Sequence, residues 1–360
     1  MVIYIGLFFT ILMLGLPTKY EIFGKNGRVL NVNFYFWIAS FISVALVEGL
    51  RDSSVGIDLP AYLRYFLNSR KIVFDAKYWI DFSGIEPGYN FLNRVLVDIS
   101  DQPRFFIFST SVIIVFLHTW FLYKNSKDLA LSMLLFLGFN HFFTSMVSLR
   151  QFIAMGFVLW CYPAMLKKQY VKAAIFAVMA FYFHQSSAAC AFIIVMAVLF
   201  KEQKRLVKWV FIAAIIMIPA VYTIYSYVLS LLSKYEFYAV GNNESGLGRL
   251  RFIYILMQTM LVVYSMIRHK DDKDEIITSM SILLIVAIYV GVVGSVIPLA
   301  FRLGYYFDYF MLLYIPELLE PDSQYYKLFR FGVILISIVF FGYYLSVNPG
   351  LTIPYKFYGE

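Results

Sequence analysis

Charged residues and cysteines are scarce in this chain. Only 14% of its residues are charged and 61% are hydrophobic, whereas about a quarter of a soluble domain is charged. This composition excludes an ordinary soluble enzyme and predicts a protein that folds within a lipid bilayer. Both cysteines, Cys161 and Cys190, lie inside apolar runs. Their placement argues against a disulfide framework or a cysteine-based metal cluster.

Recognisable cofactor motifs are also missing. The sequence has no phosphate-binding glycine motif, no zinc-ligand spacing and no nucleophile elbow, so we expect no cofactor of the kind that soluble enzymes carry. The net charge of +8 comes from basic residues spread among many connectors. A nucleic-acid-binding protein gathers such residues on one face, and we therefore expect no nucleic acid partner.

Long apolar runs fill the chain and leave no room for a separate soluble domain. A helix of roughly 20 apolar residues crosses a bilayer, and fewer suffice when its ends snorkel. We therefore predict an all-α, polytopic membrane protein with a single domain over residues 1–360. About twelve helices are expected, at Val2–Leu16, Phe34–Leu50, Phe105–Tyr123, Leu129–Met146, Phe152–Leu166, Val171–Phe183, Ala188–Phe200, Trp209–Leu232, Phe252–Ile267, Ile276–Leu299, Leu303–Ile315 and Phe331–Leu345.

The run from Val171 to Phe200 sets the predicted topology. As one straight helix it is too long for a bilayer core, and polar residues beginning at His184 interrupt it. Lysines flank the run on both sides and belong on the cytoplasmic face by the positive-inside rule. A hairpin satisfies both constraints. It places both chain ends and two loops, residues 51–104 and 233–251, on the outer face.

Lysine and arginine divide between the two faces of this topology. The cytoplasmic connectors hold 13 of 17 lysines but only 4 of 13 arginines. Arginine's planar fork suits bidentate binding of phosphate or carboxylate, whereas lysine suffices to orient the chain. The pattern favours an external anionic ligand. The alternative is that the outer arginines snorkel or pair with acids in the loops.

The first external loop carries two helix-start signals, Asp58 followed by Pro60 and Glu86 followed by Pro87. Each combines a polar residue with proline in the first turn. Apolar residues such as Tyr62 follow at helical spacing, so we predict amphipathic helices on the membrane surface. Two roles are open for Asp58, a helix cap or a catalytic residue.

Arg150 and Gln151 stand in a tight connection at the outer face, and His184 stands at the apex of the hairpin. Arg150 is either a snorkelling anchor or a cation aimed into a cavity between helices. Irregular backbone at membrane depth survives where protein or water lines it. His184 is therefore expected in a cavity, as a hydrogen-bonded structural group or as a base or ligand-binding group.

A further polar group follows the tenth predicted helix. Arg302 closes its outer end, and Tyr305 and Asp308 come just beyond. An ionisable residue at membrane depth needs a partner, so Asp308 either pairs with an arginine or serves the site. The second external loop adds Arg249 and could form a lid.

These short motifs, in this order, resemble the EpsG-like branch of the Wzy O-antigen and exopolysaccharide polymerases. The resemblance covers most of the chain and rests on Arg51 with Val55-Gly56-Ile57-Asp58 and Tyr62, then Glu86-Pro87-Gly88-Tyr89, Ser148-Leu149-Arg150-Gln151, His184-Gln185-Ser186, and Arg302 with Tyr305-Tyr306-Phe307. It implies a bacterial inner-membrane protein with a fold similar to C-type glycosyltransferases. The chain departs from other Wzy branches in lacking an external arginine followed eleven residues later by glycine.

The resemblance also implies a function, the transfer of an undecaprenyl-diphosphate-linked glycan onto the non-reducing end of another lipid-linked unit at the periplasmic face. A chain-length regulator is a possible partner. Chemistry then suggests roles: Arg51, Arg150 and Arg302 bind the diphosphate, and His184 or, second, Asp58 serves as base. We expect metal-independent action because the external acids form no dense cluster. Weaker substrate contacts are predicted at Gln151, Glu86, Tyr62, Tyr305, Asp308 and Arg249.

Two other functions remain open at this stage. An arginine-lined cavity would also suit a transporter, or flippase, of the same lipid-linked units, which internal inverted repeats would favour. A membrane acyltransferase that modifies sugars would use His184 to activate a hydroxyl, and it would depend on an acyl donor.

Overall fold

The computed structural model shows a helical protein. It describes residues 1–16, 22–23, 29–82, 84–231, 245–268, 274–294, 301–319, 324–348 and 350–359. The longer described helices are α1 (Val2–Gly15), α2 (Val32–Gly49), α5 (Pro103–Asn125), α8 (Leu149–Leu166), α9 (Tyr170–Phe183), α10 (Ser187–Leu199), α11 (Lys204–Leu231), α13 (Ser245–Arg268), α14 (Glu275–Val293) and α17 (Tyr326–Val347). The shorter elements are β1 (Ile22–Phe23), β2 (Val29–Leu30), α3 (Leu59–Asn68), η2 (Ser69–Lys71), η3 (Tyr78–Ile80), α4 (Pro87–Ile99), α6 (Leu129–Gly138), α7 (His141–Val147), α15 (Phe301–Asp308) and α16 (Met311–Leu318).

Helices lie in each of the twelve predicted segments, as far as the described residues cover them, but not every segment is one span. The fourth divides into α6 and α7, which meet at 55°, and the eleventh divides into α15 and α16. By length and composition, five described helices can cross a membrane, or six if α6 and α7 form one span. The all-helical membrane fold is therefore present. About twelve crossing helices and a likeness to C-type glycosyltransferases are not confirmed.

Local chemistry explains several helix boundaries. The Asp128 carboxylate accepts a hydrogen bond from the Leu131 amide at the start of α6, and Asp274 caps α14 in the same way. Between α6 and α7, Asn140 adopts a left-handed conformation with φ of 70°. Asparagine tolerates this conformation better than most residues, which allows the chain to bend there without breaking its packing.

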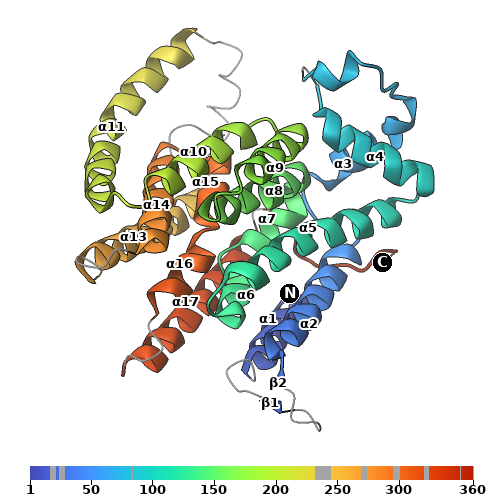
Figure 1. Cartoon of the computed structure of the whole chain (residues 1–360). Helices are drawn as coiled ribbons and strands as arrows, with labels where there is room; N and C mark the ends of the chain where they lie inside the picture. Colours follow the sequence, from blue (N-terminus) through green and yellow to red (C-terminus); the bar gives the residue numbers. More distant parts are fainter. Residues whose placement is uncertain are drawn as a thin grey trace.

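The first predicted external loop forms α3 and α4, as the helix-start signals indicated. Figure 1 shows these two helices at one end of the helical body and the β1–β2 hairpin at the opposite end. The chain's C-terminal segment lies at the same end as α3 and α4, where the Asp52 amide donates to the Lys356 carbonyl and the Tyr358 amide donates to the Leu50 carbonyl. No motif in the sequence predicts this pairing.

The N-terminal helix meets the same segment. The Tyr4 hydroxyl donates to the Thr352 carbonyl at 2.8 Å, so both chain ends lie at the end of the molecule that carries the first loop. This agrees with the predicted arrangement, in which the two ends and this loop share one face. The side of the membrane on which this face lies stays a prediction.

Helix α8 forms the centre of the packing and carries the site residues Arg150 and Gln151. It contacts α5, α9, α10 and α15, and most of its side chains are buried. Gly156 lies directly against Leu117 of α5, where a Cβ atom would approach the Leu117 side chain to 2.8 Å. The close contact fixes α8 in a rigid part of the fold, so its first turn is well placed to hold functional groups.

Candidate functional site

The centre of the site is the carboxylate of Glu86, the residue that precedes α4. Its Oε1 atom lies 2.9 Å from Nδ1 of His184, and its Oε2 atom accepts a hydrogen bond from Nη1 of Arg150 at 2.6 Å. The Gln185 amide also donates to Oε1, at 3.3 Å. One carboxylate thus joins three elements, α4, α8 and the turn between α9 and α10. We call Glu86, Arg150 and His184 the charged cluster.

Gly88 explains how α4 comes so close to α9. A Cβ atom at this position would lie 2.8 Å from the carbonyl oxygen of Tyr182, so only glycine allows this approach. Pro87 starts the helix, and Tyr182 lies two residues before His184. The Glu86-Pro87-Gly88 sequence therefore brings the carboxylate to the histidine.

Burial and charge act in opposite directions on Glu86. Its side chain is almost fully buried, and burial alone would raise the carboxyl pKa. The hydrogen bond from His184 and the guanidinium of Arg150 outweigh burial and lower the pKa of Glu86 to about 2. Glu86 is therefore a fixed anion at neutral pH. Because it holds Nδ1 of His184, Nε2 of that ring faces no hydrogen-bond partner among the described residues.

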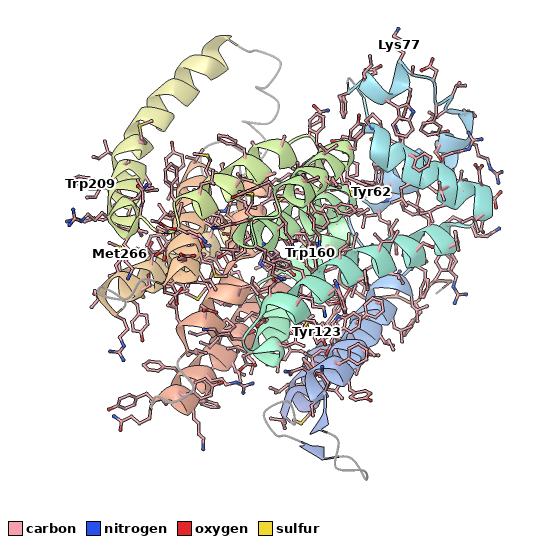
Figure 2. All side chains as sticks on the ribbon, in the orientation of Figure 1. Tyr62, Lys77, Tyr123, Trp160, Trp209 and Met266 are labelled. Carbon is pink, nitrogen blue, oxygen red and sulfur yellow. The ribbon has the colours of Figure 1, made fainter. Side chains whose placement is uncertain are left out.

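Tyrosines surround the arginine of the charged cluster. The Arg150 guanidinium lies 6.0 Å from the ring centre of Tyr89, and Tyr89 packs edge-on against Tyr62 at 5.9 Å. Burial raises the pKa of the Tyr62 hydroxyl, while the nearby Arg150 and Arg302 charges lower it and that of Asp58 raises it. Figure 2 shows Tyr62 between the α3–α4 loop and the helical body. Tyr62 thus lies within electrostatic reach of Arg150, Arg302 and Asp58.

Arg302 borders the charged cluster and, unlike Arg150, has no fixed partner among the residues that the structure describes. Its backbone carbonyl accepts a hydrogen bond from the Gln151 side chain, which ties α15 to α8. The Arg302 side chain is exposed, and no described residue forms a hydrogen bond or ion pair with its guanidinium. All its donors are therefore available to a ligand.

Asp58 precedes α3 as predicted, but its carboxylate forms no capping hydrogen bond. The capping role weighed for it is wrong. Its side chain is partly exposed and has no hydrogen-bond partner among the described residues, which leaves the carboxylate available.

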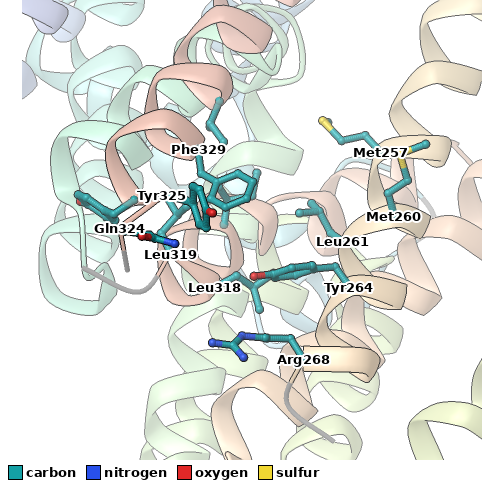
Figure 3. A pocket seen from close by; sticks show the side chains of 13 residues that line it. Met257, Met260, Leu261, Tyr264, Arg268, Leu318, Leu319, Gln324, Tyr325 and Phe329 are labelled. Atoms are coloured by element: carbon teal, nitrogen blue, oxygen red, sulfur yellow. The ribbon is translucent and has the colours of Figure 1, made fainter. Parts of the chain in front are cut away.

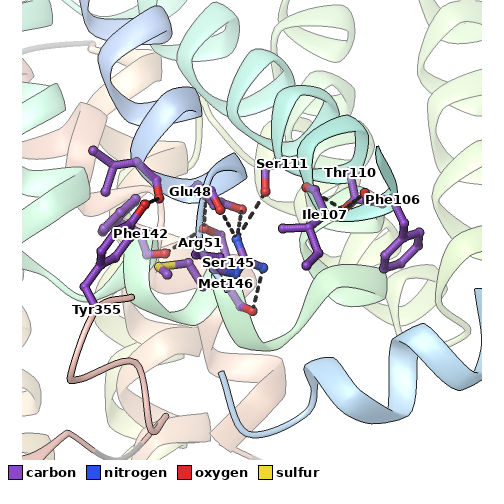
Figure 4. A network of polar contacts seen from close by, with 11 residues as sticks. Glu48, Arg51, Phe106, Ile107, Thr110, Ser111, Phe142, Ser145, Met146 and Tyr355 are labelled. Atoms are coloured by element: carbon purple, nitrogen blue, oxygen red, sulfur yellow. Dashed lines mark hydrogen bonds and ion pairs between the residues drawn. The ribbon is translucent and has the colours of Figure 1, made fainter. Parts of the chain in front are cut away.

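The structure places Arg51 in a different network, shown in Figure 4. Its side chain is fully buried, and the guanidinium donates to the Glu48 carbonyl, to Ser111 Oγ at 3.1 Å and to the Met146 carbonyl at 3.1 Å. The Glu48 carboxylate lies 3.8 Å away. The described geometry therefore does not bring Arg51 into one pocket with Arg150 and Arg302. Through its hydrogen bond to the Met146 carbonyl, Arg51 fixes the end of α7, four residues before Arg150.

The remaining predicted residues lie beyond Arg302. Tyr305 is within electrostatic reach of Arg302, Arg251 and Asp308, and the Asp308 carboxylate accepts a hydrogen bond from Gln258 at 2.6 Å. Asp308 thus has an amide partner in α13, and no ion pair with Arg302 is formed. The side chain of Arg249 lies outside the described residues, as does most of the second loop.

Sequence reasoning missed Glu48, Gln258 and Arg251. Glu48 carried a signal, since it is a lone acid near the end of an apolar run and stands three residues before Arg51, the spacing of neighbours on a helix. Gln258 and Arg251 carried no such signal in the sequence. Their partners lie at the end of α14 and in α15, far from them along the chain.

A large cavity among the described residues lies away from these groups. A groove of about 590 Å³ runs between α13, α16 and α17, and Figure 3 shows its mainly apolar lining with Arg268 and Gln324 as polar residues. No member of the charged cluster lines it. Size therefore does not identify the site. Among the described residues, no group of three or more His, Cys, Asp or Glu side chains is arranged to hold a metal ion.

Comparisons with known proteins place the chain in one family. The model of the EpsG family matches residues 34–357, a range that includes every residue of the charged cluster as well as Arg302. No curated protein and no solved structure matched the chain. The family suggests a membrane protein of the polysaccharide polymerase type. Because the match covers far more than half of the chain, this protein belongs to the EpsG family.

Proposed function

We propose that this protein is a polymerase that transfers a growing glycan from its undecaprenyl diphosphate carrier onto another lipid-linked repeat unit, at the periplasmic face of the bacterial inner membrane. The observation that carries the proposal is the arrangement around Glu86, whose carboxylate orients His184 and binds Arg150. The exposed Arg302, which has no partner among the described residues, is joined to the same helix α8 through Gln151. Such a site offers a base and an anion-binding group within one cluster.

In this reaction, a hydroxyl at the non-reducing end of the acceptor attacks the anomeric carbon of the donor. A new carbon–oxygen bond forms there while the bond from that carbon to the diphosphate oxygen breaks. Nε2 of His184 takes the hydroxyl proton, and the bond's electron pair leaves on the lipid diphosphate. No nucleotide sugar takes part.

Each residue has a distinct part in this scheme. Arg302 binds the diphosphate with its free donors and stabilises the charge that develops on it. Arg150 already bonds to Glu86, so it contributes positive charge and any donor not engaged there. Glu86 is a positioning residue, since its hydrogen bond fixes the ring of His184. Asp58 is the alternative base, because its carboxylate is free.

The proposal is tested by the length of the polymer that cells make. Arg302→Lys keeps the charge but loses the planar fork, and Arg150→Lys does the same at the cluster. We expect both variants to lose long polymer while the single-repeat product persists, and His184→Gln to slow chain growth by about 100-fold or more. Gel separation of the surface glycan measures this distribution.

Arg70→Lys is the matched control. Arg70 lies in the loop of residues 51–104 that also carries Glu86, and it forms an ion pair with Asp101 in which both side chains are about half exposed. It should leave chain length unchanged. Loss of the single-repeat product along with the polymer would instead indicate that the protein transports the lipid-linked unit. Formation of the single-repeat product also requires that this unit first reach the outer face of the membrane. A normal chain-length distribution in Arg302→Lys would overturn the proposal.

A further inference from the structure

A second polar site lies beside α15, and no residue of the charged cluster lines it. A cavity of about 100 Å³ opens between the α6–α7 bend and helices α13, α14, α15 and α17. Its polar lining consists of Asn140, His141, Arg251, Tyr254, Gln258, Tyr305 and Asp308. A space of this size holds several water molecules or part of a sugar ring.

Several polar atoms of this cavity are buried without a partner. The His141 side chain is 1% exposed, yet neither ring nitrogen has a hydrogen-bond partner among the described residues. The same holds for the Tyr254 hydroxyl and for Oδ1 of Asn140. Leaving such groups unpaired costs about 1–3 kcal/mol each. A ligand with hydroxyl groups bound in this cavity would give all three of them a partner.

The charged residues of the cavity are already positioned by the fold. Arg251 donates to the Gly294 carbonyl at 2.8 Å and stacks 4.9 Å from the ring centre of Phe301, and Gln258 orients the Asp308 carboxylate. Planar polar groups of this kind bond pairs of hydroxyls, while the aromatic lining offers faces to apolar C–H groups. Together they form the lining that a sugar ring needs.

The cavity also lies at a suitable distance from the proposed diphosphate site. Arg302, Tyr305 and Asp308 are spaced three residues apart along α15, so each lies next to the following one on the surface of that helix. At 1.5 Å per residue, Arg302 and Asp308 are about 9 Å apart along the helix axis. This separation suits a diphosphate followed by one sugar ring.

We propose that this cavity binds the sugar nearest the diphosphate of the donor and so selects which repeat unit is polymerised. The assignment rests on the proposed function, because the donor is defined there. The probe is the repeat-unit oligosaccharide hydrolysed from the polymer that the producing cell makes, without lipid or phosphate, and binding to the purified full-length protein is measured by calorimetry.

Tyr254→Phe is the main variant, because it removes only a hydroxyl that has no partner within the described structure and should not impair folding. We expect it to weaken oligosaccharide binding by about 5-fold or more, and to raise KM for the lipid-linked donor with little change in kcat. His141→Phe should do the same. His118→Phe is the matched control: His118 also packs against Tyr309 and is also buried, but it does not line the cavity.

The outcomes separate this inference from the proposed reaction. Unchanged binding in Tyr254→Phe, or equal losses in His141→Phe and His118→Phe, would overturn the sugar site even if the wild-type protein polymerises. Binding that depends on Tyr254 in a protein that makes no polymer would support the sugar site and count against the polymerase.

Discussion

At the scale of single residues, Glu86 holds the site together. Its two carboxylate oxygens bond to Arg150 and His184, and its side chain is 3% exposed. Replacing this buried carboxylate by a neutral group would leave the charge of Arg150 without a counter-charge and weaken the hydrogen bond to His184. The sequence suggested Glu86 as a helix start, as a loop acid that could pair with an outer arginine and as a weak substrate contact. The structure pairs it with Arg150 and places it at the centre of the site.

The low pKa of Glu86 makes stability depend on pH in a defined direction. Its pKa falls from the ordinary value of 4.5 to about 2 in the folded protein, so the folded state holds the anion more strongly than the unfolded state does. This contribution, at most about 3 kcal/mol, is complete above pH 4.5 and is lost as pH falls toward 2. Thermal unfolding at several pH values measures it.

Glu86→Gln isolates this effect. At pH 7 the variant should unfold at a lower temperature than the wild type, and the gap between them should narrow as pH falls below 4.5. Asp98→Asn is the control, because Asp98 forms a partly exposed ion pair with Arg94 and should change stability by about 0.5 kcal/mol or less. A gap that stays constant down to pH 3 would show that the Glu86 charge does not stabilise the fold.

At the scale of elements, the contact between α4 and α9 creates the charged cluster. Gly88→Ala introduces a Cβ atom 2.8 Å from the Tyr182 carbonyl, so the two helices must separate. We expect a loss of about 1–3 kcal/mol of stability, together with shorter polymer because Glu86 moves away from His184. Gly84→Ala in the same loop is the control, since a Cβ there meets nothing within 4 Å. Equal effects of both substitutions would contradict this account.

Helix positions were largely predictable, whereas the contacts between helices were not. Hydrophobic runs and proline signals predicted α3, α4 and the hairpin at His184. These elements could be predicted because each depends on residues close together in the sequence. The bend at Asn140 was missed, since the apolar pattern continues through it. Pairing between Asp52 and Lys356 joins distant parts of the chain. The separation of Arg51 from Arg302 depends on tertiary packing, which arginine spacing along the sequence cannot reveal.

At the scale of the whole molecule, the arrangement of the ends and loops makes a testable statement about sidedness. Lys77 lies exposed in the first loop, as Figure 2 shows, and Lys168 lies exposed in the connector between α8 and α9. We expect an impermeant maleimide to label Lys77→Cys from the periplasm, and Lys168→Cys only after the inner membrane is opened. Both native cysteines are buried and give little background. Labelling of both sites from one side would refute the topology.

The most direct measurement of the central claim uses purified protein in lipid nanodiscs with one defined undecaprenyl-diphosphate-linked oligosaccharide and no nucleotide sugar. If the cluster around Glu86 and the free guanidinium of Arg302 carry out polymerisation, the wild-type protein will produce a ladder of longer lipid-linked glycans, and Arg302→Lys will produce none. Absence of a ladder from active, folded wild-type protein, or an equal ladder from Arg302→Lys, would contradict the claim.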